Sequence, residues 1–449
     1  MTDFASGDEE FVLADPGTVL GQLQRGRGAG WRAAVRSDKG RELLRSCLEH
    51  DPRWDSQVED RADYYARLAL ALNLTVEDIE PDEVAVDDEG RALGISVLGR
   101  LAVRGDHRAL QRLRLELERP GDKSSVLWKL GEVPDGRGIE GVDAILVRSC
   151  AAGELTELID DTRHLPWETW AQSHPAIAAA RSQADELRRA SRARPVPPEA
   201  DAPVDELLGF EWSGATPKAV VRRLAETTDA SEVRALREAA TGPWGPARKL
   251  ALLALAERRD PAVVDTPAEV FTRNVVGAER ASAFRYFLAL DASVILPLAR
   301  EWLELEDDRS RVAAATMVLH STPDDLPAIR AAFSCAWSAQ SMYAICDLVD
   351  ALGRLHTVGP HPELRVVFTD VAYSYARRRA AAALAATDPE FPTTYAAECL
   401  WDCEEETRLV GAKTLDPSVS EAKSGLVQLA EDPFEVEDVR DAAREAIQR

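Results

Sequence analysis

The sequence is poor in several features that mark particular classes of protein. Its 449 residues include only 6 cysteines, which is far from the dense spacing of a disulfide framework. Its first ten residues are acidic and lack the basic and apolar regions of a secretory signal. No apolar run approaches the length that spans a lipid bilayer. From these absences we expect a cytoplasmic protein.

Positive charge is also in short supply, because 54 lysines and arginines stand against 78 acidic residues. The resulting net charge of −24 repels phosphate backbones and anionic lipid, and it steers cationic molecules toward the protein. We therefore expect a basic protein partner, no membrane association and little tendency to bind nucleic acid. A simpler interpretation is that the acidic surface only keeps a large protein soluble.

The alternating apolar and polar stretches that indicate β-strands are missing as well, whereas apolar residues recur at three- and four-residue intervals. Aromatic residues make up only 6% of the chain, so alanine and leucine supply much of its apolar content. Such a mixture is typical of closely packed helices. The sequence therefore predicts an all-α protein.

Prolines divide the chain. Four of them fall between positions 194 and 204, where they deny a helix its backbone donors and favour an extended conformation. We place a linker at 194–204, between an N-terminal helical region at 15–193 with degenerate repeats and a repeat array at 205–449. Residues 1–14 are expected to form a disordered acidic terminus.

A repeat is visible in the second part of the chain. Seven segments begin with an arginine or its equivalent and continue with small and apolar residues at helical spacing. Their starting points lie roughly 30 to 34 residues apart, which fits two helices and two turns per repeat. They start at Arg248, Arg280, Arg311, Ala344, Arg378, Arg408 and Arg440.

These residues resemble the HEAT-repeat family, in which the second helix of each hairpin carries an arginine, paired alanines and a leucine before an Asp-Pro turn. The similarity covers about 215–449 and is clearest at 311–319 and 378–389, where Asp388-Pro389 closes the repeat. It implies a right-handed α–α superhelix, a HEAT-like solenoid, whose second helices line a concave surface. We expect the arginines to bond carboxylates or helix carbonyls of neighbouring hairpins.

Two repeats depart from the pattern. The one at Ala344 lacks the arginine, and the one at Arg280 replaces small residues with Phe284, Tyr286 and Phe287. Bulky side chains at these positions would widen the helix spacing, bend the array or mark a partner-binding repeat.

No motif in the sequence predicts catalysis. The glycines at 26, 28 and 30 lack the preceding strand and the Gly-Lys-Ser/Thr of a phosphate loop, so a flexible helix entry explains them better. Cys399 and Cys403 lie one helical turn apart, but neither a second cysteine pair nor a histidine pair completes a metal site. We therefore expect no catalytic residue, cofactor or metal ion.

Large aromatic side chains and one arginine cluster are the candidate contacts for a protein partner. Tryptophan, tyrosine and arginine are the residue types that most often anchor interfaces. The arginines lie at the end of a helix beside the linker, where the simpler interpretation is a favourable interaction with the helix terminus. The candidates are Trp212, Trp244, Tyr286, Trp337, Tyr343, Tyr375, Arg188, Arg189 and Arg192.

The preferred hypothesis is a scaffold or adaptor that holds a basic protein partner on its concave surface. A narrower form is an immunity or inhibitor protein whose acidic side chains neutralise a cationic toxin. The HEAT resemblance also leaves room for an enzyme of the DNA glycosylase or lyase type. The glycosylase alternative would require the arginines to converge in a positive groove.

Overall fold

The structure is a computed structural model that describes residues 11–191, 197–212, 217–272, 277–419 and 422–449. Throughout these ranges the chain is built from helices, turns and loops, with no strand, so the predicted all-α class is confirmed. No helix in them is both long and apolar enough to cross a bilayer. Residues 1–10 of the predicted disordered terminus (1–14) and residues 194–196 of the predicted linker (194–204) lie outside the described residues. Residues 11–14 are described, and the Ala14 carbonyl oxygen accepts a 2.8 Å hydrogen bond from Arg25.

The chain forms two compact units, which are described separately below. Unit 1 contains Met1–Arg194, Val366–Ala381 and Glu390–Arg449, and unit 2 contains Pro195–Arg365 and Ala382–Pro389. One boundary coincides with the proline-rich segment. The C-terminal helices, however, belong to the same unit as the N-terminal region, which differs from the two consecutive domains that the sequence suggested.

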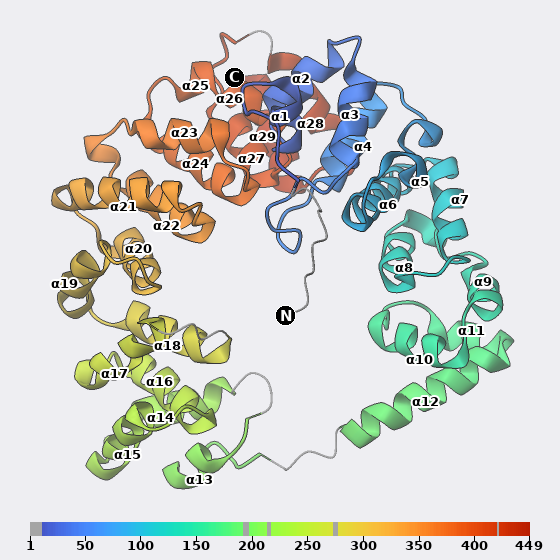
Figure 1. Cartoon of the computed structure of the whole chain (residues 1–449). Coiled ribbons are helices and arrows are strands. Elements are labelled where there is room, and N and C mark those ends of the chain that lie inside the picture. Colours follow the sequence, from blue (N-terminus) through green and yellow to red (C-terminus); the bar gives the residue numbers. More distant parts are fainter. Residues whose placement is uncertain (1–10, 192–196, 213–216, 273–276, 420–421) are drawn as a thin grey trace, which may run out of the picture. The chain divides into compact units, whose positions relative to one another are not determined.

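The helices between residues 19 and 191, labelled in Figure 1, belong to unit 1. They are α1 (Val19–Gln24), α2 (Gly28–Val35), α3 (Gly40–Leu48), α4 (Ala62–Ala71), α5 (Pro81–Val84), α6 (Asp88–Val103), α7 (His107–Glu116), α8 (Lys123–Gly131), α9 (Val142–Ser149), α10 (Ala152–Asp161), α11 (Trp167–Ser173) and α12 (Pro175–Ser191).

Unit 2 contains a further series of hairpins. Its helices are α13 (Val204–Gly209), α14 (Lys218–Glu226), α15 (Ala230–Thr241), α16 (Pro246–Arg258), α17 (Asp265–Ala268), α18 (Ala278–Ala289), α19 (Ala292–Trp302), α20 (Arg309–His320), α21 (Leu326–Ser338) and α22 (Met342–Arg354).

The last helices follow these along the chain. Two of them, α23 (Pro362–Asp370) and α24 (Ser374–Thr387), contribute residues to both units. The remaining helices belong to unit 1 and are α25 (Phe391–Thr394), α26 (Ala396–Cys399), α27 (Glu405–Thr414), α28 (Lys423–Glu431) and α29 (Glu437–Gln448).

The seven repeat segments read from the sequence each fall in one helix, namely α16, α18, α20, α22, α24, α27 and α29. Small residues let these second helices approach closely, as on α20, where Ala313 and Ala314 are buried, and on α22, where Ala351 is buried. Helix α20 packs on α22 and on α19, and α16 packs on α15 and α18. Stacked helical hairpins therefore form the core, as the sequence predicted.

Arginines connect the hairpins in two regular series. In the first, an arginine of the first helix reaches an aspartate after the second helix, and the shortest nitrogen to oxygen distance is 2.7 Å in all three cases. These pairs are Arg237–Asp260, Arg300–Asp325 and Arg365–Asp388. In the second series, an arginine of one second helix pairs with a carboxylate at or just before the start of the next. These pairs are Arg280–Asp308, Arg377–Asp402, Arg378–Glu406 and Arg408–Glu435.

The aspartates of the first series also fix the turns. Asp260 is buried, and its side chain accepts a 3.0 Å hydrogen bond from the backbone N–H of Ala262. Asp325 likewise accepts the backbone N–H of Thr322 at 2.8 Å. Asp260 and Asp325 therefore each combine a capping hydrogen bond with an ion pair.

We predict that Asp260→Ala lowers the free energy of unfolding by about 1–2 kcal/mol, because it removes the cap and leaves Arg237 without its carboxylate. Asp291→Ala is the matched control, since Asp291 also precedes a helix but is exposed and makes no capping hydrogen bond. Its effect should be below about 0.5 kcal/mol. Urea denaturation of both variants measures the difference, and equal effects would contradict the role assigned to Asp260.

Candidate partner-binding groove

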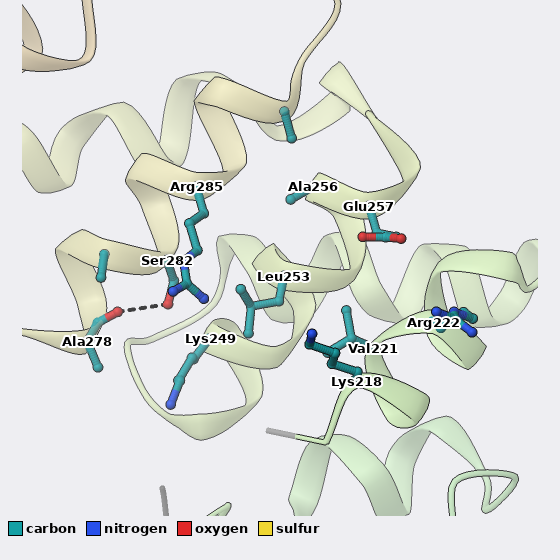
Figure 2. A pocket seen from close by; sticks show the side chains of 12 residues that line it. Lys218, Val221, Arg222, Lys249, Leu253, Ala256, Glu257, Ala278, Ser282 and Arg285 are labelled. Carbon is teal, nitrogen blue, oxygen red and sulfur yellow. Dashed lines mark hydrogen bonds between the residues drawn. The ribbon is translucent and has the colours of Figure 1, made fainter. Parts of the chain in front are cut away.

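A groove in unit 2 crosses three successive second helices, α14, α16 and α18. Its volume is about 770 Å³ (Figure 2). We call it the α14–α18 groove. The residues that line it are Lys218, Val221, Arg222, Lys249, Leu253, Ala256, Glu257, Ala278, Ala281, Ser282, Arg285 and Ala289.

Helical spacing brings these side chains to one face of each helix. On α14 the lining positions are 218, 221 and 222, on α16 they are 249, 253, 256 and 257, and on α18 they are 278, 281, 282, 285 and 289. Each set follows the i, i+3, i+4, i+7 pattern of a single helical stripe. Because α16 packs against both α14 and α18, the three stripes form one continuous surface.

The hollow follows from the size of the side chains. Ala278, Ala281 and Ser282 on α18 are short, and the Ser282 hydroxyl is turned back to donate a 2.7 Å hydrogen bond to the Ala278 carbonyl oxygen (Figure 2). Leu253 provides a half-buried apolar floor. Long basic side chains project around this floor, so the groove combines an apolar base with a charged rim.

The rim of the groove is basic although the protein as a whole is acidic. Lysines and arginines supply four of its lining residues, and Glu257 is the single acidic residue among them. Lys218, Arg222 and Arg285 are exposed, and none of these three forms an ion pair with any residue that the structure describes. Elsewhere in the described chain most arginines are paired, which makes this concentration of unneutralised charge distinctive.

Among the aromatic candidates from the sequence, Tyr286 is corrected by the structure. Its side chain is fully buried, and its hydroxyl donates a 2.7 Å hydrogen bond to the Asp260 carbonyl oxygen. The neighbouring Phe287 is also buried, in contact with Phe271 and Trp302. These bulky residues therefore fill the space between hairpins, and Tyr286 is not available to a partner.

The other aromatic candidates of unit 2 keep part of their surface. Trp212 packs edge-on against Phe210, and Trp337 stacks on Phe333. Trp244 lies beneath the Arg248 guanidinium and Tyr343 beneath that of Arg311, each at 5.0 Å from the ring centroid. None of the four lines the α14–α18 groove. The structure does not gather them into one site.

Of the arginine cluster of α12, Arg188 is neutralised by carboxylates within unit 1. Arg188 pairs with Asp160 at 2.9 Å and with Asp185 at 2.8 Å, and Arg189 donates to the Asp185 carbonyl oxygen at 3.3 Å. Arg192 lies outside the described residues. This arrangement supports the interpretation that the arginines stabilise a helix terminus.

Tyr375, the last aromatic candidate, belongs to unit 1. Its ring lies under the Arg378 and Arg379 guanidinium groups, at 3.8 and 4.9 Å from the ring centroid. Next to it is a buried cluster of charges that joins the N-terminal and C-terminal helices of this unit. The cluster contains Glu59, Arg61, Ser374, Arg377, Asp402, Cys403 and Glu404.

Two carboxylates of this cluster differ in their electrostatic environment. Burial alone would raise the pKa of Glu59, but the Arg61 guanidinium at 2.9 Å and the backbone N–H of Ser374 at 2.7 Å lower it. Burial raises the pKa of Glu404, which accepts a hydrogen bond from the Ser374 hydroxyl. Burial also raises the pKa of Cys403 to about 12, which keeps this thiol protonated.

The cluster is therefore better explained as a structural joint than as a catalytic site. Arg61 and Arg377 are fully buried, and each forms an ion pair with a fully buried carboxylate. A protonated thiol is a poor nucleophile, and the carboxylate nearest to it, Asp402 at 3.6 Å from Cys403 Sγ, is engaged by the Arg377 guanidinium. Hydrogen bonds of Arg61 and Glu59 with Ser374 hold the segment before α4 to α24, and the Arg377–Asp402 pair holds α24 to the segment before α27.

Sequence analysis missed the residues that form the groove. Lys218 and Arg222 share a face of α14, and their i, i+4 spacing is visible in the sequence. Arg285 lies within a repeat that the sequence did identify. The net charge of −24 obscured these positions, because a whole-chain sum does not reveal where unpaired cations gather.

Comparisons with known proteins add little. Searches against family models and against curated proteins found no match. A solved structure described as an engineered protein is 14% identical to this chain, with a TM-score of 0.27, and the alignment covers 96% of this chain and 99% of that one. A TM-score this low does not establish a shared fold, so the HEAT resemblance remains a prediction.

We predict opposite effects for two substitutions in the charged cluster. Glu59→Gln should lower the free energy of unfolding by about 3 kcal/mol at pH 7, because Arg61 loses its buried counterion. The lowered pKa of Glu59 means that its stabilisation is present above its unfolded-state pKa and is lost as the pH falls through the folded-state value. The defect should therefore shrink on acidification.

Glu404→Gln should be neutral or stabilising at pH 7. The raised pKa of Glu404 means that its contribution is present below its unfolded-state pKa and is lost as the pH rises through the folded-state value. Urea denaturation of both variants at pH 4 and pH 7 measures the contrast. A large loss of stability for Glu404→Gln at pH 7 would contradict this assignment.

Proposed function

We propose that this protein is a binding scaffold that holds a protein partner along the second-helix surface of unit 2. The observation that carries the proposal is the α14–α18 groove, in which basic side chains surround an apolar floor. Three of them, Lys218, Arg222 and Arg285, are exposed and have no ion-pair partner among the described residues. Such a surface matches the anatomy of protein interfaces, where an apolar centre is surrounded by a polar rim.

The groove also fits the way in which stacked hairpins present a binding surface. Three consecutive second helices each contribute one stripe of side chains, so a bound segment would contact several repeats at once. A site of this kind gains affinity from a long contact made of many modest interactions. The scaffold hypothesis from the sequence is retained in this form.

The charge of the groove changes the expectation about the partner. The sequence led us to expect a basic partner because the net charge is −24. At physiological ionic strength, exposed charges are screened over about 8 Å, so a bound segment responds mainly to the side chains that it contacts. In this groove four of those side chains are basic and one, that of Glu257, is acidic. The charge of the groove, and not the net charge of the whole chain, therefore determines the charge expected of the bound segment.

Photo-crosslinking tests the proposal. We predict that p-benzoylphenylalanine at Val221, inside the groove, forms a discrete protein adduct in a lysate of the source cells. The adduct should disappear when Arg222→Glu and Arg285→Glu are added. These substitutions should change the free energy of unfolding by no more than about 0.5 kcal/mol each, because both side chains are exposed and unpaired.

The matched control places the same photo-crosslinker at Arg234, an exposed arginine of α15 that does not line the groove. It should give no adduct of that size. Identical adducts from both positions, or none from Val221, would contradict the assignment of the groove as the partner-binding surface.

A further inference from the structure

The side chains that line the α14–α18 groove also indicate what kind of partner segment it binds. Resting on that function, we infer that the groove binds an acidic segment of a protein partner, in which carboxylates flank at least one apolar side chain. The carboxylates meet the basic rim, and the apolar side chain meets Leu253 and the short residues around it.

The placement of the basic residues supports two-sided recognition. Lys218 and Arg222 come from α14, Lys249 from α16 and Arg285 from α18, so cations reach the groove from all three helices. In Figure 2 the Leu253 side chain lies between Arg285 on one side and Lys218 and Val221 on the other. A segment with carboxylates on both sides of an apolar residue therefore complements both the rim and the floor.

Arginine makes this pairing specific. Its planar guanidinium can donate two parallel hydrogen bonds to one carboxylate, whereas the ammonium of lysine acts as a compact point charge. Arg222 and Arg285 have no competing ion pair among the described residues, so no internal carboxylate has to be displaced when a partner binds. A partner carboxylate can therefore pair with either guanidinium without competition from an internal ion pair.

Nucleic acid fits the same groove less well. Proteins that bind single strands usually stack bases on aromatic side chains, and none of the described residues that line the groove is aromatic.

Fluorescence anisotropy with three labelled probes tests the inference on the full-length protein. The first is a 14-residue peptide of glutamate with leucine at every third or fourth position. The second is a peptide of the same length with glutamate at every position, and the third is a 14-nucleotide oligothymidylate. We expect the first probe to bind most tightly and to weaken as salt is added.

Two variants assign the binding to the groove. Arg222→Glu combined with Arg285→Glu should weaken the glutamate–leucine peptide by roughly tenfold or more, because each substitution replaces attraction with repulsion. Arg234→Glu makes the same charge change on an exposed arginine of α15 and should leave the affinity within about twofold. Circular dichroism of each variant verifies that the helices are intact.

Three results would overturn the inference: the glutamate–leucine peptide does not bind, the two variants affect it equally, or the oligonucleotide binds more tightly through the groove. Equal affinity for the all-glutamate peptide would overturn the part of the inference that concerns Leu253. The proposed function can survive any of these results, since a crosslinked partner at Val221 would still identify the groove as an interface. Loss of the crosslink would instead reject the proposed function itself.

Discussion

The pairing of arginines with carboxylates between helical segments is the interaction on which the rest of the structure depends. A single hairpin of two short helices cannot bury its apolar face alone, so it needs neighbours on both sides. Alanines allow those neighbours to approach, but small apolar contacts by themselves leave their register loose. Ion pairs such as Arg377–Asp402, which is fully buried, hold the register. A shift that separated the two side chains would leave a buried charge without its partner, which is strongly unfavourable.

This constraint also explains why the α14–α18 groove stands out. Where the register is held by ion pairs, arginine side chains are committed to internal carboxylates, as Arg280 is to Asp308. Arg285 is on the same helix, five positions further along, yet it forms no ion pair with a described residue and reaches the groove. In the proposed function arginines therefore have two roles: the paired ones hold the register, and Arg222 and Arg285 recognise the partner.

Much of the fold was predictable from the sequence because it depends on local patterns. Helical periodicity predicts the second helices, and an arginine followed by small residues locates seven of them. The Asp-Pro turns were also recognisable, since Asp260 and Asp388 directly precede prolines and both accept an arginine. Contacts between distant segments were not predictable in this way, because nothing local to Glu59 or Arg61 indicates Ser374 as their partner.

The candidate site was predicted less well than the fold. Residue type suggested aromatic anchors, yet Tyr286 is buried between hairpins, since a large ring is equally suited to filling a core. The basic rim depends on which cations lack a carboxylate neighbour, and this is a property of three-dimensional packing. Spacing alone could have placed Lys218 and Arg222 on one face, but not Arg285 opposite them.

The central claim is that the α14–α18 groove is the surface on which this scaffold holds its partner. Hydrogen–deuterium exchange of the full-length protein, with and without a saturating acidic glutamate–leucine peptide, tests it most directly. The account predicts slower exchange in peptides from α14, α16 and α18, with no change in α15 or in the helices of unit 1. Protection confined to unit 1, or none in these three helices while the peptide is bound, would contradict it.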